Sequence, residues 1–526
     1  MTIPWLTILA LLPVVGAVAL IFAGVKAAKQ VALAVSLITL AFALYIATTQ
    51  FTIGGGMQLV EQAPWIKPLG VYYALGLDGV GLTLVLLVVI ITPVVIIASW
   101  RDFEPVDRGP EQVEESRSTG AETLAPKYDS RVFFALVLAV QSCALYLFLA
   151  TDVFLFYVFF EVILIPMYFL IGGFGPGPRR TYAAAKFLIF GLLGGFVMLA
   201  SIIGLYVQSD RAGEPSYLLS TLSQLNFGTA TGRWLFIGFM FAFAIKAPLV
   251  PLHTWLPDAA EESTAGGATM MVGVMDKIGT FGMIRFCLGL FPEASQWATP
   301  VVLVLATISI LYGAILAIGS RDIMRFIAYT SISHFGFIVL GIFAFTSQSL
   351  TGSSLYMLNH GLATAALFVM AGYLIKRRGS RDMNAYRGVD QVAPVLAGLL
   401  LFAGLNTLSL PGLGSFVSEF MVLAGTFGRH PAYAVISTLA IVLAALYILI
   451  MYQRTMTGPA SEEVKEKITE LNGRERLAMA PLVLLILLLG VFPKPMLSVI
   501  EPSTQATMQH VGVTDPEPRV SAEGGR

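Results

Sequence analysis

The sequence predicts an all-α polytopic membrane protein, and two observations support this fold class. Hydrophobic residues make up 56% of the 526 residues and charged residues only 12%, which gives a mean hydropathy of +0.80. The apolar residues gather in runs long enough to cross, as helices, a hydrocarbon layer about 30 Å thick. A soluble core needs much less apolar sequence, so we expect a protein that crosses a membrane many times.

The apolar runs predict about fourteen transmembrane helices. They cover approximately residues 4–24, 31–49, 80–99, 132–149, 153–173, 182–207, 233–257, 267–291, 299–319, 325–347, 353–377, 392–424, 432–455 and 477–499. The twelfth run is too long for one straight crossing and contains Pro411 and Gly412. We therefore predict discontinuous helices at the seventh span, described next, and at the twelfth.

The seventh span carries Lys246, with Pro248 and Pro251 directly after it. Proline has no N–H and clashes with the carbonyl four residues earlier. The main-chain carbonyls of Ala244 and Ala247 should therefore lose their helical partners. Free carbonyls at membrane depth are tolerated only where they are buried in protein or line a wet cavity. A lysine beside such a break predicts an ion path.

Basic residues are distributed unequally over the loops. If the N-terminus lies outside, loops with 21 of the 32 Lys and Arg residues face the cytoplasm, and loops with seven face the opposite side. Cytoplasmic loops carry the excess of Lys and Arg, so we expect both termini on the outer side. The first apolar run has no basic segment before it, and we interpret it as a retained helix.

Intramembrane charges are the candidate functional residues, because a charge at bilayer depth costs about 3 kcal/mol or more. Span five places Glu161 in an apolar helix, and Lys246 is its natural partner. The two could form a static structural pair or a pair that separates. A buried lysine that leaves its carboxylate partner gives up its proton more readily. Lys277 in span eight could receive that proton.

Two histidines and a glutamate continue this series. Histidine is the natural relay residue near neutral pH, although a single buried histidine is often only a satisfied hydrogen-bonding group. His334 and His360 lie, in chain order, between Lys277 and Glu419, and we predict relay roles for both. Glu419 follows Pro411 by eight residues, about two helical turns. We predict that it is the terminal proton site, near the exit to the outside.

Several further charged residues each have two interpretations. Lys186 could influence the carboxylate of Glu161 or extend to the membrane interface. Arg285 stays protonated and cannot relay, so it could bias the local electric field or extend to the interface. Asp78 could cap a helix at the surface or take part in transport. Asp258 and Glu261 could help protons enter from the cytoplasm or cap the next helix.

No motif predicts a cofactor or a metal in this chain. Cys143 and Cys287 both lie in apolar runs, without metal-ligand spacing or a disulfide framework. The motifs CxxC, GxGxxG and GxxxxGK[ST] do not occur. We therefore expect that the chain binds no iron–sulfur cluster, flavin, nucleotide, haem or metal. The formal net charge of zero argues against a nucleic-acid partner.

Four blocks of sequence resemble a known family. They are KAPLVPLHTWLPDAAEESTAGG (246–267), DKIGTFGMIRF (276–286), IAYTSISHFGF (327–337) and LPGLGSFVSEF (410–420). These blocks are similar to the antiporter-type subunits of respiratory NADH–quinone oxidoreductase, complex I, and the resemblance extends over about residues 70–455. It implies fourteen helices with two inverted five-helix repeats, a proton half-channel in each repeat, and a central polar axis that joins them.

The resemblance also implies a division of the chain and a role for each matching residue. The expected segments are 1–100 (three N-terminal helices), 101–131 (a charged cytoplasmic loop), 132–291 (first repeat), 299–455 (second, inverted repeat) and 456–526 (charged loop, last helix and a poorly ordered polar tail). The residues that match the family's proton path are the ion pair Glu161 and Lys246, the central Lys277, the connecting His334 and His360, and the terminal Glu419.

Within the family, the chain resembles one subunit type and departs from the usual pattern in two places. A glutamate at position 419 matches the M type, called subunit 4 in mitochondria, whereas the L and N types have a lysine there; the chain also shows no long lateral helix like that of the L type. Asp276 precedes Lys277 where an apolar residue is common, and PDAAEES replaces the usual run at 257–263. The aspartate could alter the proton affinity of Lys277.

The resemblance implies a proton-translocating membrane-arm subunit of the complex, in a bacterial inner membrane, with L-type, N-type and small subunits as partners. FMN, iron–sulfur clusters and quinone would be bound by other subunits, so this chain would do no redox chemistry itself. Two alternatives remain open at this stage. One is a subunit of a multi-subunit sodium/proton antiporter, which shares most of these motifs. The other is a purely structural membrane subunit, whose charges only hold the bundle together.

Overall fold

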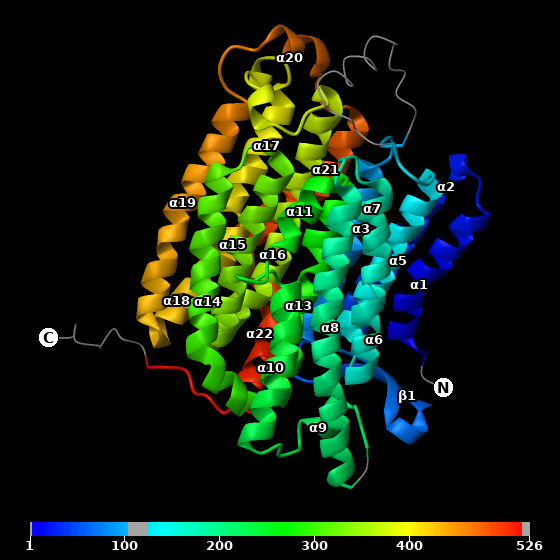
Figure 1. Ribbon diagram of the computed structural model, residues 1–526, viewed down its shortest axis with the longest axis vertical. Helices are drawn as coiled ribbons and strands as arrows, with labels where there is room; N and C mark the ends of the chain where they lie inside the picture. Colours follow the sequence, from blue (N-terminus) through cyan, green and yellow to red (C-terminus); the bar gives the residue numbers. More distant parts are fainter. Residues whose placement is uncertain (1–2, 104–124, 214, 518–526) are drawn as a thin grey trace, which may run out of the picture.

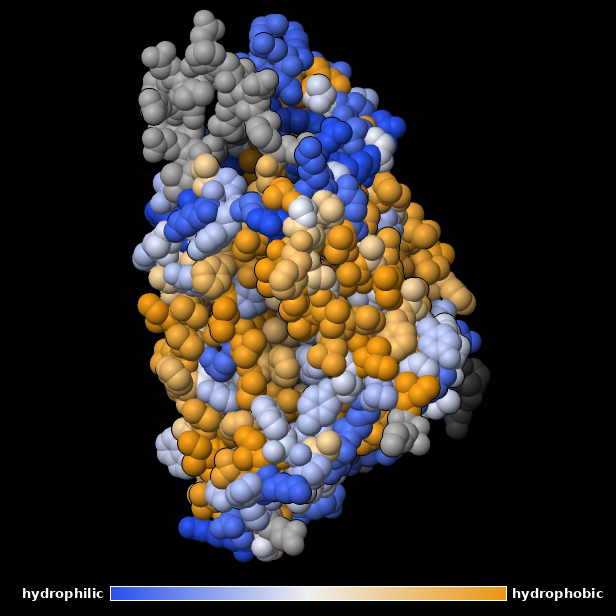
Figure 2. All heavy atoms as spheres, turned by 90° about the vertical axis from the view of Figure 1, so that its right-hand side faces the viewer, coloured by the Kyte–Doolittle hydropathy of each residue, from blue (hydrophilic) through white to orange (hydrophobic). Residues whose placement is uncertain are grey.

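The computed structural model describes residues 3–103, 125–213 and 215–517, which form an elongated bundle of helices (Figure 1). Ten helices in this part of the chain are long and apolar enough to cross a membrane, or eleven if one strongly bent pair counts as a span. The space-filling view shows a broad apolar band between two hydrophilic ends (Figure 2). The prediction of a helical, multi-span membrane protein is confirmed.

The helices of the first part are α1 (Trp5–Phe22), α2 (Val25–Tyr45), α3 (Gly79–Ala98), α5 (Ser130–Leu149), α6 (Val153–Val162), α7 (Leu164–Phe174), α8 (Arg180–Arg211), α9 (Leu219–Leu222), α10 (Thr229–Lys246), α11 (Trp255–Glu262), α12 (Ala265–Ala268) and α13 (Lys277–Gly282). Those of the second part are α14 (Pro292–Gly319), α15 (Ile323–Phe343), α16 (Ser347–Arg378), α17 (Pro394–Thr407), α18 (Gly414–Arg429), α19 (Pro431–Thr455), α20 (Glu462–Lys467), α21 (Gly473–Val491) and α22 (Lys494–Val511). Short 3-10 helices are η2 (Lys67–Leu69), η5 (Met383–Ala385) and η6 (Val389–Gln391), and π-helical segments are η1 (Ile46–Gln50), η3 (Thr269–Met275) and η4 (Met283–Leu288).

The chain is not purely helical, which corrects the predicted all-α class. Strands β1 (Gln58–Ile66) and β2 (Val71–Leu77) form an antiparallel hairpin between α2 and α3. Gly70 turns the chain with a φ of 65°, a conformation that glycine adopts without steric penalty. The hairpin lies between the second and third predicted spans. It contains no apolar run long enough to cross a membrane, so hydropathy alone does not indicate it.

The hairpin is held by the ends of helices on the same side of the bundle. The carboxylate of Glu61 accepts hydrogen bonds from the main chain of Leu6 (2.6 Å) and from the hydroxyl of Thr7 (2.5 Å) at the start of α1. Asp152 at the start of α6 accepts from the N–H of Tyr72 (3.0 Å). A two-stranded hairpin is marginally stable alone, so these contacts stabilise it against the bundle.

The seventh span is broken as predicted, because α10 ends at Lys246 and α11 begins nine residues further on. The carbonyl of Ala244 is nevertheless not free. Pro248 cannot donate to it, and the next N–H along the chain, that of Leu249, donates instead at 3.0 Å. The indole N–H of Trp255 donates to the carbonyl of Ile245 at 3.0 Å. The break therefore satisfies its own main chain, as membrane depth requires.

The twelfth span is also discontinuous, because α17 ends at Thr407 and α18 begins at Gly414. Asn359 on α16 donates its amide to the carbonyl of Gly414 at 2.7 Å. Ser409, within the break, has a φ of 61°, which is uncommon for a residue other than glycine. A third interruption, between α6 and α7, follows Glu161 by two residues.

The eighth span is irregular in a way that the sequence did not predict. It consists of α12, the π-helical η3, the single short helix α13 and the π-helical η4. Single π-helical turns occur frequently at functional sites. Asp276 and Lys277 lie at the junction between η3 and α13.

The end of the chain differs from the predicted poorly ordered tail. The last span bends by 71° between α21 and α22, and α22 continues past Pro502 to Val511. Ser503 accepts a hydrogen bond from the N–H of Gly79 at 2.9 Å, and Thr504 contacts Thr351 at 2.7 Å. Polar residues that the sequence assigned to a tail are therefore used for packing across α3 and α16. Helix α20 lies in the predicted charged loop 457–476, while residues 104–124 of the loop 101–131 lie outside the described residues.

Helices α10 and α13 make backbone-to-backbone contact at Gly279, which gives a first prediction. A Cβ there would lie 2.6 Å from the nitrogen of Ala247 and 2.7 Å from the carbonyl oxygen of Phe243, whereas one on Gly398 in α17 would meet nothing within 4 Å. Both substitutions to alanine remove the same helix penalty, so their difference isolates the packing. We expect Gly279→Ala to lower stability by about 1–3 kcal/mol relative to Gly398→Ala, measured by thermal unfolding in detergent. Equal stability of the two variants would contradict the close contact.

Candidate functional site

A line of titratable side chains runs through the middle of the bundle; we call it the buried polar line. It comprises Glu161 on α6, Lys246 on α10, Asp276 and Lys277 at the η3–α13 junction, His360 and Tyr356 on α16, His334 on α15 and Glu419 on α18. All of them except Glu161, which is partly exposed, are buried. The structure thus brings every residue of the predicted proton path into one region.

The first part of the line contains Glu161 and Lys246. An ideal Cβ on Gly195 of α8 would lie 1.6 Å from a carboxylate oxygen of Glu161, so the glycine provides the space that this side chain occupies. Glu161 is the first opposite charge that acts on Lys246, but the two are not in hydrogen-bond contact, and both have charged atoms without a partner among the described residues. The ammonium group of Lys246 lies 4.4 Å from the ring centre of Phe160.

The ammonium group of Lys277 begins a nearly continuous series of contacts. It donates to the carbonyl of Val272 at 2.5 Å and contacts Nδ1 of His360 at 2.8 Å. The ring of His360 faces that of His334, with 5.4 Å between their centres. The Nε2 atoms of both rings are buried and have no partner among the described residues. Side chains that can accept and release a proton therefore follow the lysine.

Tyr356 links these histidines to Glu419, and the sequence interpretation did not include it. Its hydroxyl contacts Nδ1 of His334 at 2.5 Å and donates to the carboxylate of Glu419 at 2.9 Å. Ser409, in the break before α18, donates to the same carboxylate oxygen at 2.5 Å. Tyr356 precedes His360 by four residues, so the two share one face of α16. This four-residue spacing from His360 was the sequence feature that could have identified Tyr356.

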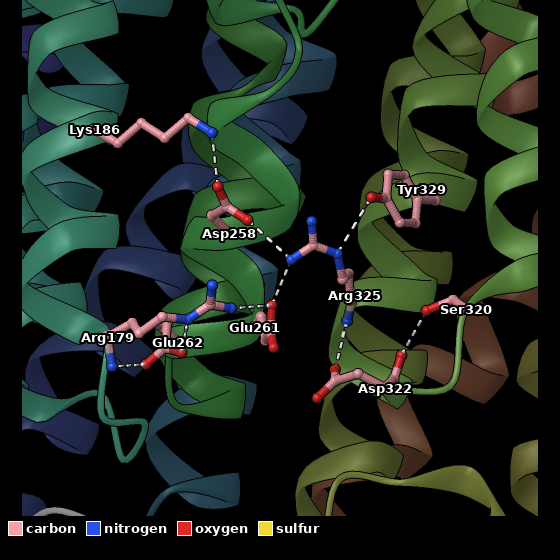
Figure 3. Close-up of polar contacts among 9 residues, drawn as sticks. All are labelled: Arg179, Lys186, Asp258, Glu261, Glu262, Ser320, Asp322, Arg325 and Tyr329. Atoms are coloured by element: carbon pink, nitrogen blue, oxygen red, sulfur yellow. Dashed lines mark hydrogen bonds and ion pairs between the residues drawn. The ribbon is translucent and has the colours of Figure 1, made fainter.

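A second group of charges lies on and around α11 (Figure 3). Asp258 accepts from Lys186 of α8 at 2.6 Å and from Arg325 of α15 at 2.9 Å. Arg325 also contacts Glu261 at 2.5 Å, and its Nε donates to the hydroxyl of Tyr329 at 3.2 Å. Lys186 therefore pairs with an aspartate, rather than influencing Glu161 or extending to the interface as the two interpretations proposed.

Helix α11 is joined to α8 by a further pair of contacts. The main-chain N–H of Arg179 donates to Glu262 at 3.1 Å, and its guanidinium contacts Glu261 at 3.4 Å. Asp258 and Glu261 of α11 thus bridge α8 in the first half to α15 in the second, while Glu262 contacts Arg179 (Figure 3). Helix α11 continues the broken span after Lys246. These ion pairs therefore hold that part of the span against α8 and α15.

Asp78 and Arg285 lie on the opposite side and bind each other. The Asp78 carboxylate caps α3 by accepting from the N–H of Gly81 at 2.8 Å, which confirms the capping interpretation. The same oxygen accepts from Arg285 at 2.7 Å, so this arginine is paired rather than extended to the interface. Both residues line a cavity of about 460 Å³ between the hairpin, η4 and α22.

The fold and the site define a class of protein. Broken membrane helices that place lysine, histidine and carboxyl groups in one buried line are the arrangement of proteins that move ions across membranes. In the described residues no group of three or more His, Cys, Asp or Glu side chains could hold a metal ion.

The particular family follows from comparison with known proteins. The chain belongs to the family described as "NADH:quinone oxidoreductase/Mrp antiporter, TM", whose family model matches residues 150–446. It is 48% identical to "NADH-quinone oxidoreductase subunit M" of Mycobacterium tuberculosis, over 99% of this chain and 96% of that protein. The resemblance drawn from the four sequence blocks is confirmed.

Two solved structures have the same fold. A chain of respiratory complex I from Thermus thermophilus with bound NADH is 32% identical, with a TM-score of 0.85, and the match covers 97% of this chain and 100% of that chain. A chain of the Mrp complex from Dietzia is 20% identical, with a TM-score of 0.81 and coverage of 97% and 100%. At that identity, the second likeness shows the fold alone.

The α11 bridges give a second prediction. Asp258→Asn removes the charge from two contacts, with Lys186 and Arg325, and should lower stability by about 1–3 kcal/mol. The control is Asp390→Asn, because the side chain of Asp390 is exposed and has no hydrogen bond or ion pair with the described residues. Thermal unfolding in detergent measures the difference. Identical unfolding of the two variants would exclude a structural role for the Asp258 bridge.

Proposed function

We propose that this chain is a proton-translocating subunit in the membrane arm of an NADH–quinone oxidoreductase. The observation that carries the proposal is the series of contacts from Lys277 through His360, His334 and Tyr356 to Glu419. Each of these groups can accept and release a proton, and the series extends from the middle of the eighth span to the second helix break. A purely structural bundle has no need of such a series at membrane depth.

The direction of transport follows from the position of each group. Asp258 and Lys186, on the side with the basic loops, would take up protons from the cytoplasm. Lys246 would receive them beside Glu161, and Glu419 would release them to the outside. The coupling is Coulombic, because neutralising one group of a buried pair changes the proton affinity of the other. Electron transfer would supply the driving signal from elsewhere in the complex.

The finer architecture belongs to the same proposal. We infer fourteen spans. Ten single helices and the bent pair α21–α22 are long and apolar enough to cross a membrane, and α10 with α11, the irregular segment from α12 to η4, and α17 with α18 would each form one further, interrupted span. We also infer two inverted five-helix repeats, within segments 132–291 and 299–455. The matching breaks after α10 and after α17 support this inference.

The location and the partners complete the proposal. The excess of Lys and Arg at one end of the bundle favours outer-side termini in a bacterial inner membrane. The partners would be the L-type, N-type and small subunits of the membrane arm, with FMN, iron–sulfur clusters and quinone bound by other subunits. The sodium/proton antiporter alternative is less well supported, since the relative at 48% identity is named as an oxidoreductase subunit.

The first test addresses the complex and its central lysine. The tagged chain, purified gently from native membranes, should bring down NADH oxidation and bound FMN. Lys246→Ala should abolish proton translocation driven by NADH in vesicles, because the lysine beside the helix break is lost, while the complex still assembles. Lys26→Ala, an exposed lysine on α2, is the control.

Two results would overturn this proposal. Full proton translocation in Lys246→Ala would remove the lysine from the mechanism. Sodium-dependent proton exchange in vesicles, without co-purifying NADH oxidation, would favour the antiporter alternative.

The second test addresses Tyr356. Tyr356→Phe keeps the ring but removes the hydroxyl between His334 and Glu419, so proton translocation should fall by about tenfold or more. Tyr373→Phe is a matched control on the same helix, because its buried hydroxyl has no hydrogen-bond partner among the described residues. Equal rates of NADH-driven acidification in the two variants would exclude Tyr356 from the path.

A further inference from the structure

Asp276 is a buried carboxylate that the proposed path does not yet use. Its side chain has no exposed surface, and neither carboxylate oxygen has a hydrogen-bond partner among the described residues. Burying a carboxylate without such partners is unfavourable. A buried carboxylate with both oxygens unpartnered indicates that Asp276 has a specific role.

The helix geometry directs Asp276 and Lys277 toward different neighbours. Asp276 lies three residues before Gly279, so the two share a face of the helix. Gly279 is in backbone contact with Ala247, the residue after Lys246. The next side chain, that of Lys277, points to α16 and contacts His360. The junction between η3 and α13 thus presents a carboxylate toward the end of α10 and an amine toward α16.

The charges around Asp276 are the two lysines of the line. Lys277 and Lys246 are the positive groups that act on its carboxylate, and Glu161 is the other negative group that acts on Lys246. A structural ion pair buried in a protein normally has its remaining hydrogen bonds satisfied. Here the ammonium of Lys246 and both oxygens of Asp276 lack partners among the described residues. This arrangement suits groups that exchange a proton better than a fixed pair.

We propose that Asp276 carries protons between Lys246 and Lys277. This inference rests on the proposed function and deepens it. In the first step the ammonium of Lys246 transfers a proton to the carboxylate of Asp276, which leaves a neutral amine and a carboxylic acid. In the second step that acid protonates the neutral amine of Lys277 and returns to the carboxylate. One proton moves from α10 to the helix that faces α16, and the charges balance at each step.

With Asp276, the buried polar line has a proton-carrying group at each change of helix. In this proposal protons pass between α6 and α10 through Glu161 and Lys246. They pass from α10 to the eighth span through Asp276, and from that span to α16 through Lys277. A chain in which an apolar residue replaces Asp276 would have to connect the two lysines in another way. The proposed step through the carboxylate would therefore occur only in chains that have an acidic residue at this position.

The test uses the intact complex in vesicles and three substitutions. Asp276→Asn and Asp276→Leu cannot carry a proton and should slow NADH-driven proton translocation by about tenfold or more. Asp276→Glu keeps a carboxyl group and should retain most of the rate. Asp276→Leu places an apolar side chain of similar size at this buried position, so it provides a second neutral variant if Asp276→Asn does not assemble.

Infrared difference spectroscopy separates proton transfer from a fixed counter-ion role. The NADH-reduced minus oxidised spectrum should contain a carbonyl band of a buried carboxylic acid that disappears in Asp276→Asn. Wild-type translocation in either neutral variant would overturn the proposal, and so would slowed translocation without any change in that band. Lys246→Ala is measured in parallel: if it is inactive while the Asp276 variants are fully active, this inference alone fails and the proposed function stands.

Discussion

The structure depends on one constraint, which is that ionisable side chains must be held inside an apolar bundle. Lys246, Lys277 and Glu419 are buried at positions where water cannot reach them freely, and each isolated charge there is unfavourable. The bundle meets this constraint by placing the groups in one line, where every charge has an opposite charge or a polar side chain close to it. Proton transfer along the line uses the same proximity, so the arrangement that makes burial possible also makes transport possible.

Interrupted helices and glycines allow the line to exist. The break after α10 follows Lys246 directly, and the break after α17 brings the hydroxyl of Ser409 to the carboxylate of Glu419. Glycines then remove the side chains that would separate the helices: Gly195 leaves space for the carboxylate of Glu161, and Gly279 lets α13 approach the break directly. Tight packing leaves little freedom to move these contacts, so the line is held with defined spacing.

Helix α11 gives the broken span a mechanical connection to both halves of the bundle. Asp258 binds Lys186 of the first half and Arg325 of the second, directly beyond the break that holds Lys246. A change of charge at this cluster would act on α8, α11 and α15 together (Figure 3). The cluster therefore ties the position of the segment beyond the break to charged groups on both halves of the bundle.

The sequence by itself determined the membrane class, the two discontinuous spans and the charged residues that the bundle buries, because hydropathy, proline and intramembrane charge are local properties. Tertiary structure decided the partners: Asp258 for Lys186, Asp78 for Arg285, and Tyr356 between His334 and Glu419. It also decided the hairpin, the π-helical turns around Lys277 and the helical course of α22. Partner choice depends on which helix faces meet, and the periodicity of a single span defines its own faces but not the face that packs against them.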